Sequence, residues 1–262
     1  MIFGLFRKSG PAEAADPLAE ARSLAAAGQY EAALALWGPL AHRGDASAAN
    51  NVGACFAGGL GVARDEALAL TWFRLAAEQG SAAGMRNLAT ALFKGSGAAQ
   101  DHAGALAWYR KAAEAGDAEA QDMASWMLLE GEIVPFDPVE ARRWAELAAA
   151  AGVAAAMTRM GMICHNALGV ERDPEQAARW WAKGVEAGDA DAMAMLGAAN
   201  HLGQGVERDP MRAMTLLIMA QELGAPMAGL FFEAVRAGIP PEAFEKADRL
   251  ARDLLAQRRS AP

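Results

Sequence analysis

Residues 65–80 read DEALALTWFRLAAEQG, and variants of this stretch recur along the chain. Within it, Ala69, Trp72 and Ala76 are spaced by three or four positions, which places them on one face of a helix. Aspartate is favoured at the N-cap of a helix, and glycine is favoured just after its last turn. The stretch therefore predicts one complete helix that begins at Asp65 and ends before Gly80.

The pattern returns every 36 residues. Its large aromatic position is occupied by Trp72, Trp108, Trp144 and Trp180. Its aspartates are Asp65, Asp101, Asp137, Asp173 and Asp209, and its closing glycines are Gly44, Gly80, Gly116, Gly152, Gly188 and Gly224. A fixed period of this length is typical of repeat proteins, in which stacked units bury a continuous core. We therefore interpret the aspartates as helix caps rather than catalytic carboxylates, and the tryptophans as packing residues rather than a ligand cage.

A second predicted helix precedes each of these stretches and carries a small residue near its middle. These residues are Gly53, Ala89, Ser125, Gly161 and Gly197. Glycine inside a helix costs about 1 kcal/mol, so we expect close contact with another helix to compensate. In four repeats a glycine-containing loop then leads to the capping aspartate. Because a helix rather than a strand precedes it, this loop is a turn and not a phosphate-binding loop.

The domain organisation follows from where the pattern begins and decays. We expect a disordered tail over residues 1–16, a tetratricopeptide-like helix pair over 17–45, and five repeats of 36 residues over 46–224. A degenerate repeat and a charged capping helix follow over 225–259. The fold class is all-α, with about seven antiparallel helix pairs.

Composition restricts the partners. The net charge is −8, which disfavours nucleic acid because phosphate neutralisation needs a basic surface. Cys55 and Cys164 lie about three repeats apart, too far for a disulfide, so we expect free thiols and a cytoplasmic protein. No apolar run is long enough to span a membrane. Residues 1–8, MIFGLFRK, place apolar residues before charges, unlike a secretory signal. They are a frayed tail or, alternatively, a weak membrane-surface anchor.

The recurring text resembles the Sel1-like repeat family, a relative of tetratricopeptide repeats. The segment 196–213 carries the first half of the motif, and 52–80 carries the whole of it. Repeat three departs at residues 132–136, where the glycine-valine turn belongs, and Leu216-Leu217 replaces the aromatic pair in repeat five. The resemblance implies a right-handed α-α superhelix. It also implies a non-catalytic adaptor of protein complexes and signalling, which binds through its concave surface.

In such a stack the first helix of each pair lines the concave surface. Residues there that do not serve the repeat are available to a protein or peptide partner. The candidate binding residues are Asn51, Arg86, Asn87, Phe93, Lys94, Met123, Trp126, Arg159, Met162, His165 and His201. The asparagines would hold a peptide backbone, Arg86 and Lys94 would meet an acidic group, and the aromatic and methionine side chains would take an apolar anchor.

Other interpretations remain open for these residues. One alternative is that they face solvent or pack within the stack, with Asn51 and Asn87 serving the structure of the repeat. His165 and His201 are one repeat apart, but zinc needs three or four ligands, so we expect no metal and no cofactor. The first hypothesis is a bacterial, non-catalytic scaffold. The alternatives are a hydrolase of the β-lactamase type known from this family, whose many disulfide cysteines are missing here, and an adaptor attached to a membrane surface through residues 1–8.

Overall fold

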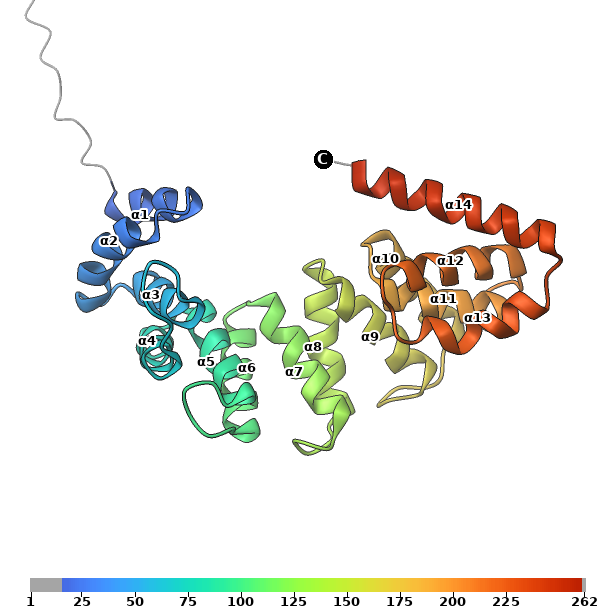
Figure 1. Ribbon diagram of the computed structural model, residues 1–262. Coiled ribbons are helices and arrows are strands. Elements are labelled where there is room, and N and C mark those ends of the chain that lie inside the picture. The colour runs from blue at the N-terminus through green and yellow to red at the C-terminus, as the bar shows by residue number, and fades with distance from the viewer. Residues whose placement is uncertain (1–15, 261–262) are drawn as a thin grey trace, which may run out of the picture. The chain divides into compact units, whose positions relative to one another are not determined.

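The computed structural model describes residues 16–260, which form fourteen helices and no strand (Figure 1). The predicted fold class is confirmed, because the chain is an all-α repeat solenoid. It divides into two compact units, and the division falls after Ala112, within α6 (His102–Glu114). Residues 1–8, the alternative membrane anchor, lie outside the described residues.

The first unit contains five complete helices and most of α6. The complete helices are α1 (Pro17–Ala26), α2 (Tyr30–His42), α3 (Ala46–Gly58), α4 (Glu66–Glu78) and α5 (Ala82–Lys94). Each packs against the next along the chain, and α3 also contacts α5. One buried cluster joins α1, α2 and α3 around Trp37 and Val52, and a second joins α4 and α5 around Phe73 and Leu88.

The second unit contains the eight helices that follow α6. They are α7 (Ala118–Glu130), α8 (Pro138–Ala150), α9 (Ala154–His165), α10 (Pro174–Glu186), α11 (Ala190–Leu202), α12 (Pro210–Glu222), α13 (Ala228–Ala237) and α14 (Pro241–Ser260). A large buried cluster spans α9 to α14 and includes Trp181, Leu196 and Leu217. The long last helix lies against α12 (Figure 1). Ala247 and Ala251 of this helix are buried.

The predicted helix boundaries are confirmed. All five repeat aspartates accept a hydrogen bond from a backbone N–H in the first turn of α4, α6, α8, α10 or α12. Three of those helices begin with proline, as expected. The six closing glycines all have positive φ, between 81° and 94°. Local chemistry therefore fixes both ends of each second helix.

Asp137 caps the beginning of α8, and its removal should destabilise the protein. Its carboxylate accepts hydrogen bonds from the N–H groups of Val139 and Glu140, at 3.1 and 2.9 Å. Asp137→Ala should lower the free energy of unfolding by about 1 kcal/mol, because those N–H groups lose their acceptor. Asp137→Asn, which keeps a capping oxygen, is the control and should cost much less. Urea unfolding followed by circular dichroism measures both, and equal losses would show that capping is not the cause.

The mid-helix glycines make room for a side chain of the second helix in the same repeat. A Cβ added at Gly161 in α9 would overlap the indole of Trp181 in α10, and one added at Gly53 would approach the ring of Phe73. Trp181 is only 3% exposed. The expected close contact with another helix is thus confirmed, and it is made within the repeat rather than between repeats.

The tryptophans at the repeated position are less buried than their role as packing residues suggests. Trp144 is 2% exposed, whereas Trp72, Trp108 and Trp180 are half-buried at the edges of the buried clusters. The residue that follows the repeated tryptophan position is buried in every repeat. This set is Phe73, Tyr109, Ala145, Trp181 and Leu217. The deepest contact between the two helices therefore lies one residue further along than the tryptophan spacing indicates.

A second set of glycines brings each loop against a helix of the preceding repeat. These glycines are Gly61, Gly97, Gly169 and Gly205, all with positive φ. An added Cβ would meet the first turn of α2, α4, α8 and α10 respectively. The contact recurs with the same 36-residue period. At these four positions the absence of a side chain therefore lets the loop approach the neighbouring helix closely.

Candidate functional site

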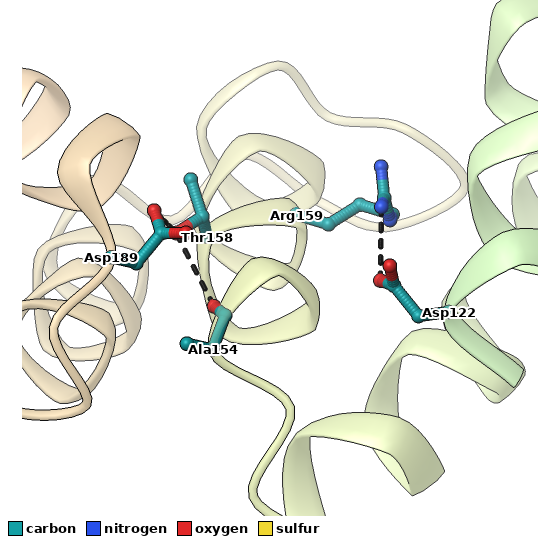
Figure 2. A network of polar contacts seen from close by, with 5 residues as sticks. All are labelled: Asp122, Ala154, Thr158, Arg159 and Asp189. Carbon is teal, nitrogen blue, oxygen red and sulfur yellow. Dashed lines mark hydrogen bonds and ion pairs between the residues drawn. The ribbon is translucent and has the colours of Figure 1, made fainter. Parts of the chain in front are cut away.

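In the second unit, α9 lies between the two other first helices, α7 and α11. Two residues adjacent in its sequence reach to opposite sides, because successive positions on a helix differ by about 100°. Figure 2 shows Arg159 extending toward Asp122 and Thr158 extending toward Asp189. These two residues thereby connect α9 to α7 on one side and to the turn before α11 on the other.

The contact between Arg159 and Asp122 is a largely buried ion pair. The Nη2 atom of Arg159 lies 2.9 Å from Oδ1 of Asp122, and the two side chains are 14% and 13% exposed. The Nε atom of Arg159 is buried and has no hydrogen-bond partner within residues 16–260. The predicted binding residue Arg159 therefore already holds one carboxylate, and its remaining donor capacity is incompletely used.

Thr158 fixes the beginning of α11. Its hydroxyl donates to Oδ1 of Asp189 at 2.7 Å, and it also contacts the carbonyl oxygen of Ala154 at 3.4 Å (Figure 2). The same Asp189 oxygen accepts the N–H of Ala192 at 2.7 Å and so caps α11. The carbonyl oxygen of Thr158 in turn accepts the indole N–H of Trp181 at 3.3 Å. These contacts hold the Asp189 carboxylate in a defined position.

A cavity of about 350 Å³ opens beside these contacts. Its lining comes from α7, α9, α11 and the residue before α13: Trp126, Ala155, Thr158, Arg159, Met162, Asp189, Asp191, Met195 and Met227. The structure thus brings together three of the predicted binding residues, Trp126, Arg159 and Met162. The volume is at the lower end of the range for ligand sites.

Sequence reasoning did not select the two aspartates of this cavity. Asp189 belongs to the turn before α11, and Asp191 is in the first turn of that helix. Burial, and then the neighbouring charge of Asp189, raises the pKa of the Asp191 carboxyl above its ordinary value. The sequence feature that could have indicated them is a second aspartate two positions after the capping one.

In the first unit, other predicted residues line a cavity of about 220 Å³ between α3, α4 and α5. Asn87 and Lys94 contribute to it, together with Phe73 and Thr90. The side-chain amide of Asn87 donates to Oδ1 of Asn50 in α3 at 2.8 Å. That bond links neighbouring repeats and uses part of the capacity that Asn87 would need to hold a peptide backbone.

The remaining predicted residues line neither cavity. Phe93 packs edge-on against His102, with 5.2 Å between ring centroids. His165 lies against Trp181 at 5.5 Å, and burial, followed by the charge of Arg172, lowers its pKa. The others are part-buried on their helices: Asn51, Arg86, Met123 and His201.

The described thiols are poorly suited to nucleophilic chemistry. Cys55 and Cys164 are free and buried. Burial raises the pKa of each thiol above its ordinary value, which reduces the thiolate fraction that would react. Within residues 16–260, no three His, Cys, Asp or Glu side chains gather in a way that would hold a metal ion.

The repeated helix pairs, joined by loop glycines and by contacts between first helices, define a solenoid repeat protein. The chain belongs to the Sel1 repeat family, whose model matches residues 46–81, 82–117, 118–153, 154–189 and 190–224. Members of this family generally mediate protein–protein interactions, and the repeat is typically a non-catalytic scaffold.

Solved structures of bacterial proteins are similar to this chain. A Sel1 repeat protein from Oxalobacter formigenes is 28% identical, with a TM-score of 0.81, covering 90% of this chain and 97% of its own. A sel1 repeat protein from Klebsiella pneumoniae subsp. pneumoniae is 21% identical, with a TM-score of 0.46, covering 70% and 90%. Cysteine rich protein B from Helicobacter pylori is 20% identical, with a TM-score of 0.40, covering 48% and 91%.

No curated protein matches this chain. Among the helices of the described residues, none is both long enough and apolar enough to cross a membrane.

Proposed function

We propose that this protein is a non-catalytic interaction scaffold that binds a segment of a partner protein on the exposed faces of its first helices. In the second unit, the binding surface is the cavity lined from α7, α9 and α11. The observation that carries the proposal is the meeting of Trp126, Arg159 and Met162 at that cavity. Aromatic residues and arginine are the usual energetic centres of protein interfaces, and methionine adapts to different partners.

The contrast between repeated and variable positions within the repeat supports this proposal. The repeated alanines and the residues after the tryptophan position are buried in the core, and the repeated aspartates and glycines end the helices. The first-helix residues at the cavity do not follow the repeat: position 126 is tryptophan, whereas its equivalents at 162 and 198 are methionine and alanine. Positions that vary between repeats can differ without changing the common fold, so a contact specific to one partner can be placed there.

The first unit offers a second, smaller surface of the same kind. The amide of Asn87, the ammonium of Lys94 and the ring of Phe73 all line its cavity. Thr90 in this wall shares a 2.8 Å hydrogen bond with the hydroxyl of Tyr109. Burial raises the pKa of that hydroxyl above its ordinary value, so it stays neutral and can donate or accept a hydrogen bond. This surface would suit an acidic or polar side chain of the partner.

Quantitative capture from the native host tests the proposal. Trp126→Ala combined with Met162→Ala should reduce recovery of specific partners by about tenfold or more, because truncating interface anchors typically costs 2 kcal/mol or more. The control is Leu147→Ala on α8, since Leu147 is also exposed, at 43%, but lies outside the cavity. Mass spectrometry compares the recovered proteins. Recovery that is the same for the double variant and the control would refute the proposed surface.

A further inference from the structure

The cavity of the second unit has an unbalanced charge. Arg159 is its one cationic lining residue, and its guanidinium is paired with Asp122. Two more carboxylates, those of Asp189 and Asp191, line the same cavity. Within the described part of the chain, neither is in an ion pair with lysine, arginine or histidine. Among the described residues, the cavity therefore presents two carboxylates that form no ion pair with a basic side chain.

The electrostatic state of Asp191 agrees with this imbalance. The side chain of Asp191 is still exposed, but partial burial and then the like charge of Asp189 raise the pKa of its carboxyl. Asp189 cannot turn away to relieve the repulsion, because its Oδ1 accepts hydrogen bonds from Thr158 and from the N–H of Ala192. A positive group placed between the two carboxylates would remove the repulsion and gain charge-assisted hydrogen bonds.

The rest of the lining is apolar and flexible. Met162 is 40% exposed and Met227 is 36% exposed, and the half-buried Met195 lies in the same wall. Methionine side chains accommodate an alkyl chain of varied course. Lysine and arginine bury such a chain along apolar surfaces while keeping the charged end at a polar rim. The methionines therefore match the alkyl chain of a basic side chain, and the two carboxylates match its charged end.

We propose that this cavity binds a lysine or arginine side chain of the partner segment, with its methylene groups on Met162, Met195 and Met227 and its charge at Asp189 and Asp191. The inference rests on the proposed function, because it assumes a protein partner at this surface. It adds the chemistry of the residue that is recognised.

Peptides selected from a random display library against the full chain provide the test. Each is titrated against protein with isotope-labelled methionine methyl groups, so that signals of the three cavity methionines report binding at this place by nuclear magnetic resonance. The selected peptides should share a lysine or arginine. Replacing it with norleucine, which keeps the chain but not the charge, should weaken binding by about tenfold or more.

Variants of the protein complete the test. Asp189→Asn combined with Asp191→Asn should weaken the same peptides by about tenfold, and asparagine at 189 keeps the cap of α11. The matched control is Asp209→Asn, which changes the cap of α12 outside the cavity and should leave affinity unchanged. Peptides that shift the methionine signals equally well with norleucine, or equally well with the double variant, would overturn the basic-residue inference while the proposed function stands. Failure of every selected peptide to shift those signals would overturn both.

Discussion

Arg159→Met should lower the free energy of unfolding by about 3 kcal/mol, which we expect to be one of the two largest effects of a single substitution in this protein. The reason is the partner left behind: Asp122 is only 9% exposed, and its carboxylate would lose the guanidinium that lies 2.9 Å away. An unpaired charge in such a place is far more costly than a missing contact. Methionine is unbranched like the arginine stem, so the loss of packing should be small.

A second substitution separates the ion pair from the packing. Asp122→Leu together with Arg159→Met removes both charges and should recover most of the lost stability, because well-packed apolar replacements of a buried pair are often neutral. Urea unfolding of the three proteins gives the comparison. Hydrogen exchange should place the loss in α7 and α9, since each repeat contacts mainly its neighbours. A double variant as unstable as Arg159→Met would contradict this account.

Gly205→Ala should be comparably destabilising, by about 3 kcal/mol. Gly205 has φ of +71°, where a residue with a Cβ is strained by about 1–2 kcal/mol. The added Cβ would also overlap the carbonyl oxygen of Pro174 at the start of α10, and overpacking typically costs another 1–3 kcal/mol. Relief requires the loop and α10 to separate, which loosens the contact between repeats four and five.

Gly224→Ala is the control for the strain alone. Gly224 has φ of +81°, but an added Cβ there meets no atom within 4 Å. This substitution should therefore lower the free energy of unfolding only by the backbone strain of a positive φ, about 1–2 kcal/mol. The difference between the two variants in thermal or urea unfolding measures the close approach. Equal losses would mean that Pro174 moves aside freely and that the loop does not hold the repeats together.

The sequence predicted the helices well because their ends depend on local chemistry. Asp137 with Pro138 and Gly152 with its positive φ identify one helix without reference to any other part of the chain. It predicted less well which aromatic position would be most buried. Trp180 and Trp181 are adjacent tryptophans on one helix, so the sequence does not separate them. Only the rotation of α10 against α9 decides that Trp181 fills the space beside Gly161.

The candidate site was predictable in part for a similar reason. Trp126, Arg159 and Met162 stand out because they depart from the repeat, and they line one cavity. The pair Asp122 and Arg159 is 37 residues apart rather than 36, as is the pair Asn50 and Asn87. Contacts between neighbouring first helices are therefore diagonal, which a search at the repeat period does not reveal. The role of Met227 depends on how α13 folds back, where the pattern has decayed.

The loop glycines restrict how this chain can change in length during evolution. Each one lies against the first turn of a helix that belongs to the preceding repeat. Gain or loss of whole 36-residue segments by recombination between repeats keeps every such glycine opposite a helix start. An insertion of another size inside a repeat would shift the glycine away from its partner. Related sequences should therefore differ by whole repeats, with irregular insertions confined to segments such as 132–136, where this glycine is already replaced by Ile133.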